Sequence, residues 1–327
     1  MRIISNKLKS TGIIALLILP VLSLAAEHEA EDQGNDTTNP VKLSELSLDE
    51  IAKELSNPVT ALASLNNDFE YRIYQGSLPA ADDDSAFIYT LRPSIPIPLS
   101  NGKNILMRLG IPINGTQPIY EVGQGDDYAE ISPFLIRQNA STIPTDGTFD
   151  NYHGHSHLGD IDFDIAYGGV SENGFISMYG IAGVLPTSQD LSQSIDQYQL
   201  GPEIALGKVT GWGVYGAWLT HLTRVYGEDK WDTNMTSLKI FFAYGLGNGW
   251  QVFSNPVIEY DWEGDPDNQL FLPLGAGVSK TTRIGNIPMK FAFEIQKYIA
   301  SPDAIGPDWL FTFSATPVFR NPFQDRD

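Results

Sequence analysis

The chain has 327 residues, with 20 Lys and Arg against 40 Asp and Glu, and a formal net charge of −20 at pH 7. This acidity argues against a nucleic-acid partner, because the phosphate backbone is bound by basic surfaces. The sequence contains no cysteine, which excludes disulfides, thiolate metal sites and a lipid-carrying cysteine near the N-terminus.

Residues 1–26 have the pattern of a secretory signal peptide. Three cations precede an apolar run from Gly12 to Leu24, and small residues follow at the expected cleavage site. The apolar run is shorter than the roughly 20 residues that a membrane-spanning helix needs. We therefore expect export, and an exported chain with no later spanning helix would be either soluble or a β-barrel.

Residues 27–46 are polar and acidic, and we expect them to form a flexible segment. Residues 47–66 are expected to contain an amphipathic helix. Ser47 and Glu50 have the spacing of a capping box, and apolar residues recur at helical intervals until Pro58, which should break or kink the helix. This helix would either pack against the body of the protein or plug the mouth or lumen of a barrel.

From residue 67 onward the hydrophobic period changes from helical to two. The clearest example is the stretch 159–167, in which Ile161, Phe163 and Ile165 alternate with aspartates. In a β-strand this alternation produces one apolar face and one charged face. A half-buried strand of a soluble sandwich would show the same pattern. The long aromatic-rich alternating segments that follow favour a strand with lipid on one side and a wet lumen on the other.

The connections between these segments alternate between short turns and long polar loops, which is the asymmetry of an outer-membrane barrel. Residues 114–157 fit this alternation when they are treated as one long inserted loop, with or without a hairpin of its own. Residues 67–319 then contain about twelve strands, an even number that leaves both chain ends on the periplasmic side. We predict an all-β protein, an antiparallel transmembrane up-and-down β-barrel with a short N-terminal helix and a C-terminal tail at 320–327.

Charged residues of the predicted strands fall mainly on one parity. We assign that parity to the lumen, because a charge on the lipid face costs roughly 2–4 kcal/mol at the membrane midplane. The opposite parity is rich in Phe and Leu, and tryptophans including Trp218 lie mostly near segment ends, as an interfacial aromatic belt requires. The lumen-facing candidates are Glu70, Arg72, Arg92, Arg108, Asp160, Asp162, Asp164, Glu203, Lys239, Glu259, Lys290 and Glu294.

Several longer motifs also occur in a fixed order along the chain. They include RPSIPIPL (92–99), LGDIDF (158–163), GVLPT (183–187), LGPEIALGK (200–208), WGVYGAWLTHLTRVYGE (212–228), EYDWE (259–263) and LPLGAGVSK (272–280). Together they resemble the bacterial outer-membrane transporter-like family labelled "MetA-pathway of phenol degradation", whose members are often misnamed neuromedin U. The segment 114–157 looks like an insertion relative to that family, and residues 320–327 extend beyond the last aromatic strand.

The resemblance implies a β-barrel in the outer membrane of a Gram-negative bacterium that passes small hydrophobic or aromatic compounds. The expected partners are outer-membrane lipid, the barrel-assembly machinery and such a solute, and no cofactor is expected. An alternative is an outer-membrane barrel with a structural or adhesive role and no transport.

One histidine cluster lies in the inserted loop. His153, His155 and His157 could share one face of a strand and bind Zn²⁺, Ni²⁺ or Cu²⁺, although a solvated polar loop is the preferred interpretation. His155 and Ser156 also raise the possibility of a lipid-modifying serine hydrolase. That chemistry requires an orienting residue and an oxyanion hole, and the sequence identifies neither. We therefore predict no enzymatic activity and no catalytic residue.

Overall fold

The computed structural model describes residues 43, 45–123, 129–152, 156–188, 194–229 and 231–323. The predicted signal peptide (1–26), most of the predicted acidic segment (27–46) and residues 324–327 of the tail lie outside the described residues. No helix in the described part of the chain is long and apolar enough to cross a membrane.

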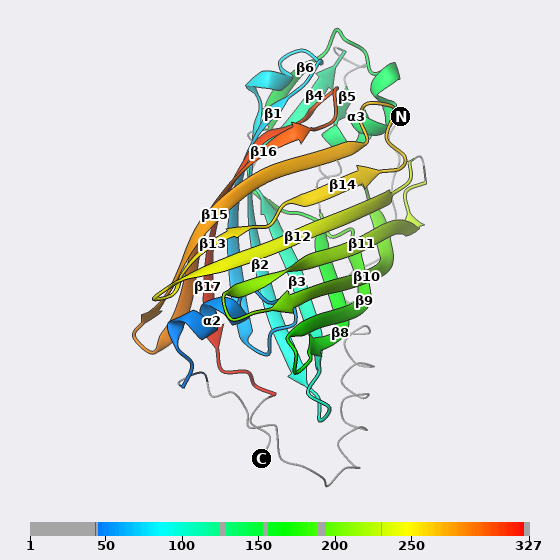
Figure 1. Cartoon of the computed structure of the whole chain (residues 1–327). Helices are drawn as coiled ribbons and strands as arrows, with labels where there is room; N and C mark the ends of the chain where they lie inside the picture. The colour runs from blue at the N-terminus through cyan, green and yellow to red at the C-terminus, as the bar shows by residue number, and fades with distance from the viewer. Residues whose placement is uncertain are drawn as a thin grey trace.

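The described residues form a closed barrel of 12 antiparallel strands, shown in Figure 1. Strands that follow one another in the wall are neighbours in the sheet, and the first strand pairs with the last. The up-and-down barrel predicted from the sequence is therefore confirmed. The wall consists of β1 (Ala63–Gln75), β2 (Ser85–Pro98), β3 (Asn104–Asn114), β8 (Ile161–Val170), β9 (Phe175–Leu185), β10 (Gln197–Val209), β11 (Gly213–Gly227), β12 (Asn234–Gly247), β13 (Trp250–Ser254) with β14 (Val257–Asp261), β15 (Leu270–Ile284), β16 (Ile287–Ala300) and β17 (Gly306–Phe319).

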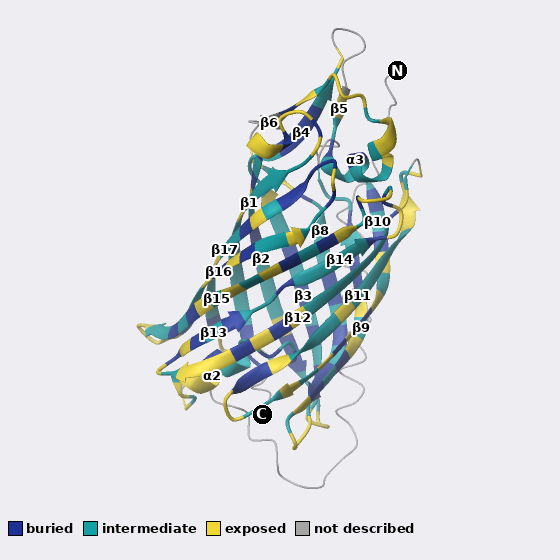
Figure 2. Cartoon of the chain, turned by 45° about the horizontal axis from the view of Figure 1, so that its top comes forward, coloured by how far each residue is buried: buried dark blue, intermediate teal, exposed yellow. Residues whose placement is uncertain are grey.

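Side chains alternate between the two sides of the wall, as Figure 2 shows by the alternation of buried and exposed residues along the strands. On β10, Ile204 and Leu206 are exposed, whereas Glu203 and Ala205 are buried. Other strands likewise have large apolar side chains on their outer face, including Phe242 and Phe313. An apolar surface of this extent is unusual for a protein that is surrounded by water.

β13 and β14 are two halves of one wall strand, which the sequence pattern predicts as a single segment. Pro256 lies between them and has no backbone N–H for the ladder. Asn255 instead donates its N–H to Glu294 Oε1 at 2.8 Å, and the Ser254 hydroxyl donates to the Gly275 carbonyl at 2.7 Å. The ladder with β15 is consequently interrupted between Phe253 and Glu259.

Helix α2 (Leu48–Glu54) lies at the end of the barrel where the short turns are found (Figure 1). Its N-terminus has the predicted capping box, in which Ser47 Oγ accepts from the Glu50 N–H and the Glu50 carboxylate accepts from the Ser47 N–H. The Asp49 carboxylate accepts from the N–H of Gly249 at 2.5 Å, in the turn between β12 and β13. The helix is shorter than the predicted stretch 47–66, since it ends at Glu54 and β1 already begins at Ala63.

Residues 55–62, which we call the lumenal segment, run from α2 to β1 inside the ring of wall residues. Val59 is buried and packs against Leu106, Met178 and Val214, which are inward-facing side chains of β3, β9 and β11. The Val59 carbonyl also accepts from Asn104 Nδ2 at 3.2 Å. The lumenal segment therefore occupies the interior at the short-turn end.

The inserted stretch 114–157 folds into a structure of its own at the opposite end. It contains β4 (Gln117–Val122), β5 (Ala129–Ile131), α3 (Pro133–Asn139) and β6 (Thr148–Tyr152), and its three strands pair in the order β5-β4-β6. We call the described residues of 117–152 the cap. A single-turn helix, η5 (Ala140–Thr142), follows α3, and β7 (His157–Leu158) pairs with β3 where the chain returns to the wall. The other long-loop element is η3 (Ala81–Asp83), between β1 and β2.

Candidate functional site: a charged interior between two chain segments

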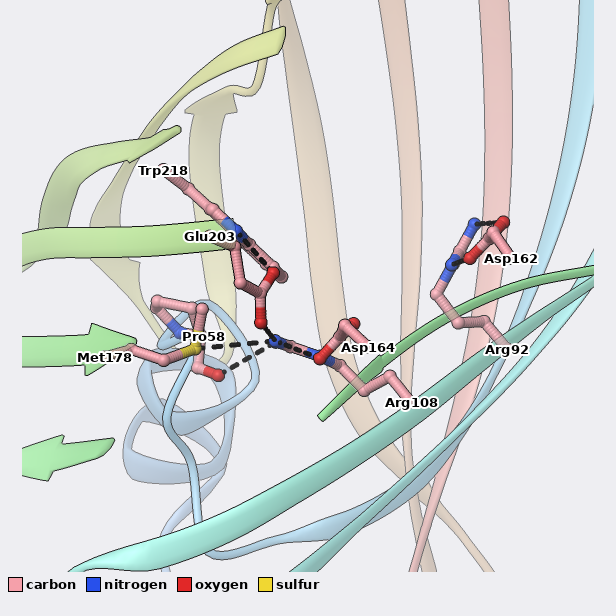
Figure 3. Close-up of polar contacts among 8 residues, drawn as sticks. All are labelled: Pro58, Arg92, Arg108, Asp162, Asp164, Met178, Glu203 and Trp218. Carbon is pink, nitrogen blue, oxygen red and sulfur yellow. Dashed lines mark hydrogen bonds and ion pairs between the residues drawn. The ribbon is translucent and has the colours of Figure 1, made fainter. Parts of the chain in front are cut away.

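Arg108 of β3 is the centre of a buried ionic cluster in the barrel, drawn in Figure 3. Its Nη2 lies 2.7 Å from Asp164 Oδ2, and its Nε lies 2.9 Å from both oxygens of that carboxylate. Glu203 approaches the guanidinium more loosely, at 4.0 Å. Because the Glu203 side chain is only 1% exposed, its charge depends on these neighbours for compensation.

Trp218 of β11 completes this cluster. Its ring centroid lies 4.2 Å from the Arg108 guanidinium carbon, and its indole Nε1 donates to Glu203 Oε2 at 3.0 Å. The ring face lies beside the cation and the indole N–H satisfies one carboxylate oxygen, while Glu203 Oε1 has no hydrogen-bond partner among the described residues. The sequence pattern assigned Trp218 to the interfacial belt, and this was wrong because Trp218 faces the interior. Both parities of the segment 212–225 are largely apolar, so no alternation signal could orient this residue.

Arg92 and Asp162 form a second ion pair, with distances of 2.5 and 3.2 Å. They belong to β2 and β8, which are separated by β3. Gly110 of β3 lies directly opposite Asp162, and a Cβ on Gly110 would be 2.1 Å from Asp162 Oδ1. The missing side chain therefore allows the carboxylate to reach across one strand to the guanidinium.

Further polar residues continue this lining toward both ends. Arg72 pairs with Glu70 at 2.7 Å on β1, and the Asp68 carboxylate accepts from Ser314 at 2.5 Å. Lys239 interacts electrostatically with two cations, Arg92 and Arg108, and with two carboxylates, Asp68 and Glu294. Asp68 shares its parity with Glu70 and Arg72, so the alternation signal could have identified it as a lumenal residue.

Among the remaining predicted lumenal residues, Lys290 and Asp160 bond to the N-terminal region and to a loop, and Glu259 bonds to the neighbouring strand β12. Lys290 donates to Ser56 Oγ at 2.9 Å, and Glu259 accepts from Ser237 at 3.2 Å. Asp160 was predicted to lie within a strand, but β8 begins at Ile161, so Asp160 lies just before the strand. Its carboxylate accepts from the Ser194 hydroxyl at 2.7 Å and the Ser188 N–H at 3.0 Å. Burial raises the pKa of Asp160, and these hydrogen bonds oppose that rise.

The predicted histidine cluster cannot be followed as a unit, since His153 and His155 lie outside the described residues. His157 begins the short strand β7. Across the described ranges, no group of three or more His, Cys, Asp and Glu side chains is arranged to hold a metal ion.

No family model matches the chain, and no curated protein matches it. Among solved structures, the COG4313 outer membrane channel from Pseudomonas putida F1 aligns with a TM-score of 0.56 and 10% identity, over 81% of this chain and 98% of that chain. This similarity shows that the chain has the fold of an outer-membrane β-barrel.

Two further barrels align less closely. A Pseudomonas aeruginosa FadL homologue has a TM-score of 0.42 and 10% identity, over 85% of this chain and 96% of that chain. Outer membrane phospholipase A from Escherichia coli has a TM-score of 0.39 and 11% identity, over 91% of this chain and 97% of that chain.

Proposed function

We propose that this protein is a channel of the Gram-negative outer membrane that passes small hydrophobic or aromatic compounds, as the resemblance to the phenol-degradation family implies. The observation that carries the proposal is a closed barrel with an apolar exterior and a charged interior, occupied at one end by its own N-terminal region. An exterior of this kind suits lipid, and paired charges of both signs suit a wet interior with weak charge selectivity.

The lumenal segment is the barrier in this proposal. Arg108 Nη1 donates to the Pro58 carbonyl at 3.1 Å, and Lys290 donates to Ser56 on the other side of the interior. Both contacts join the segment to the wall through single hydrogen bonds, each of which contributes roughly 0.5–3 kcal/mol. A movement of the segment that exchanged these bonds and the one from Asn104 to the Val59 carbonyl for water would open this end of the barrel.

The apolar surroundings of Val59 support a hydrophobic solute. This side chain fills a cluster formed by Leu106, Ile176, Met178 and Phe241, all of which are buried. If the lumenal segment moved, the cluster would be exposed to water at a cost proportional to its apolar area. A hydrophobic solute that replaced Val59 would avoid that cost, so Val59 serves as a stand-in for the proposed solute.

Solute flux into proteoliposomes tests the proposal. The Val59→Asp variant introduces a charge into the apolar cluster and should expel the segment, whereas Val59→Ile is the matched control that retains it. We expect an aromatic alcohol to enter vesicles with Val59→Asp faster than vesicles with Val59→Ile. Heat-modifiable gel mobility would show that both variants are folded barrels. Flux of folded Val59→Asp no greater than that of protein-free vesicles would overturn the channel proposal.

A structural or adhesive barrel is the second candidate, and the folded cap favours it, because a folded external structure offers a surface for contact outside the cell. The same flux measurement separates the two functions. A barrel without a transport role should show no solute-dependent flux even when the lumenal segment has been released.

A further inference from the structure

We propose that the cap is an outer lid, fixed to the barrel along an apolar side and fastened by a polar latch on the other, so that it controls access to the interior from outside. This inference rests on the proposed function, because it assigns the second gate of the same solute path. Figure 1 shows β4, β5, β6 and α3 gathered at the end of the barrel opposite α2.

The fixed side of the cap is a small hydrophobic core. Tyr120, Ile136 and Phe149 of the cap are buried together with Leu78 and Ile305, which lie in the loops between β1 and β2 and between β16 and β17. The rings of Tyr120 and Phe149 are 4.8 Å apart. Separating these surfaces would expose apolar area to water, so the cap should remain attached along this side.

The opposite side of the cap contacts other loops through polar groups. The Arg137 carbonyl accepts from the N–H of Asp265 at 2.8 Å, and Asp265 Oδ2 accepts from both the N–H and the hydroxyl of Ser141 at 2.9 Å. Gln138 Nε2 donates to the Asp232 carbonyl at 2.6 Å. We call these contacts the latch. The side-chain contacts of Gln138 and Ser141 are exposed, so water can replace them.

The position of the latch explains why the cap can cover the opening. Asp232 lies between β11 and β12, and Asp265 lies between β14 and β15. The loops of the fixed side belong to β1, β2, β16 and β17. The wall strands β15 and β14 separate them from the loop of Asp232, whereas the loop of Asp265 adjoins them, because β15 pairs with β16. A structure attached at both places extends over part of the barrel mouth, and release of the latch alone would uncover it.

Arg137 provides the part of the latch that faces the barrel. Its Nε lies 3.7 Å from Asp261 Oδ2, and neither atom has a hydrogen-bond partner within the described ranges. The guanidinium also lies over the Phe271 ring, 4.9 Å from its centroid. A buried ion pair at this separation lacks the hydrogen bonds that would make it strong. The Arg137–Asp261 pair therefore favours the closed position of the cap only weakly.

The first experiment measures access to the interior and does not depend on transport. Because the chain has no cysteine, Gln296→Cys places a single thiol on the inward face of β16, where Gln296 is 5% exposed. The labelling rate with a membrane-impermeant maleimide added from outside is then compared after Asp265→Ala, which weakens the latch by removing both hydrogen bonds from Ser141. Asp146→Ala, which removes an exposed cap carboxylate away from the latch, is the matched control.

We expect Asp265→Ala to raise the labelling rate about tenfold, in proportion to the open fraction of the lid, and Asp146→Ala to leave it unchanged. Equal labelling rates in the two folded variants would overturn the lid. Gel mobility before and after heating verifies folding of each variant.

A second experiment holds the latch closed. Ser141→Cys with Asp265→Cys places two thiols where the hydroxyl and carboxylate now meet, and Glu121→Cys with Thr148→Cys joins two paired strands within the cap. In the Val59→Asp background, oxidation of the first pair should stop solute flux and reduction should restore it, while oxidation of the second pair should have no effect. Equal flux before and after oxidation of the first pair would contradict the lid, whereas absence of flux in Val59→Asp itself would contradict the channel.

Discussion

Arg108 on the barrel wall donates a hydrogen bond to the carbonyl oxygen of Pro58 within the barrel, at 3.1 Å. The same guanidinium binds Asp164 and stacks on Trp218. One side chain of β3 therefore joins β8, β11 and the N-terminal region. This makes Arg108 both a structural ion-pair partner and the contact that positions the lumenal segment.

Arg108→Met should destabilise the barrel by about 3 kcal/mol, because Asp164 and Glu203 would remain buried without a cation. The loss is measured by denaturant unfolding in detergent, with gel mobility as the readout. Arg92→Met is the matched control. The Arg92–Asp162 pair is roughly one-third exposed, at 36% and 42%, and its removal should cost less than about 1 kcal/mol. Equal losses for the two variants would show that burial does not distinguish these pairs.

Ser47→Ala should weaken α2 by about 1 kcal/mol, since it removes the capping hydroxyl. The hydrogen bonds from the Ser47 side chain and backbone lower the pKa of Glu50. The stability that the Glu50 carboxylate contributes is therefore present above the ordinary glutamate pKa and is lost as the pH falls through the lowered value. NMR titration of the Glu50 carboxyl should give a higher midpoint in Ser47→Ala. Ser56→Ala, beyond the end of the helix, should leave the midpoint unchanged.

Asp160→Asn should change the pH dependence of stability in the opposite sense. Burial raises the pKa of Asp160, so its contribution is fully present below the ordinary aspartate pKa and is lost as the pH rises through the raised value. Asparagine retains an acceptor for Ser188 or Ser194 and does not titrate. Unfolding midpoints measured across this range should fall less steeply in the variant, and identical slopes would exclude Asp160 as the source.

Gly216→Ala should destabilise the barrel by about 1–3 kcal/mol, through overpacking against Phe241. A Cβ at this position would be 2.4 Å from Phe241 Cζ and 2.3 Å from the Leu206 carbonyl oxygen. Gly211→Ala is the control, because no atom lies within 4 Å of its added Cβ. The temperature at which gel mobility changes should fall for Gly216→Ala alone.

Much of the barrel could be predicted from alternation, because a wall with lipid on one side and charges on the other imposes a strict period of two. Arg92, Asp162 and Asp164 are visible in this way as residues of one parity. Which of them pair could not be predicted, since the Arg92–Asp162 contact depends on the missing side chain of Gly110 in the strand between them. Pro256 marks the break after Ser254 in the sequence, but the Glu294 carboxylate that accepts from the Asn255 N–H belongs to another strand and could not be predicted.

The cap could not be predicted from local patterns. Its strands β5 and β6 are short, and the partners of its core, Leu78 and Ile305, are far away in the sequence. Ile136 is buried only because the cap packs against the β1–β2 and β16–β17 loops, and no local sequence pattern indicates that contact. The capping box at Ser47 was visible because both partners lie within one turn of helix, and it is present as expected.

The lumenal segment directly precedes β1, and β1 completes the cylinder by pairing with β17. Asn321, just after β17, donates to the carbonyl oxygens of Ala61 at 3.3 Å and Pro96 at 2.9 Å. The seam between the first and last strands therefore contacts the lumenal segment through Ala61. The lumenal segment must therefore enter before the seam forms, or thread through an end afterwards. The order of these two steps thus decides whether the interior of a newly folded barrel is occluded or open at the short-turn end.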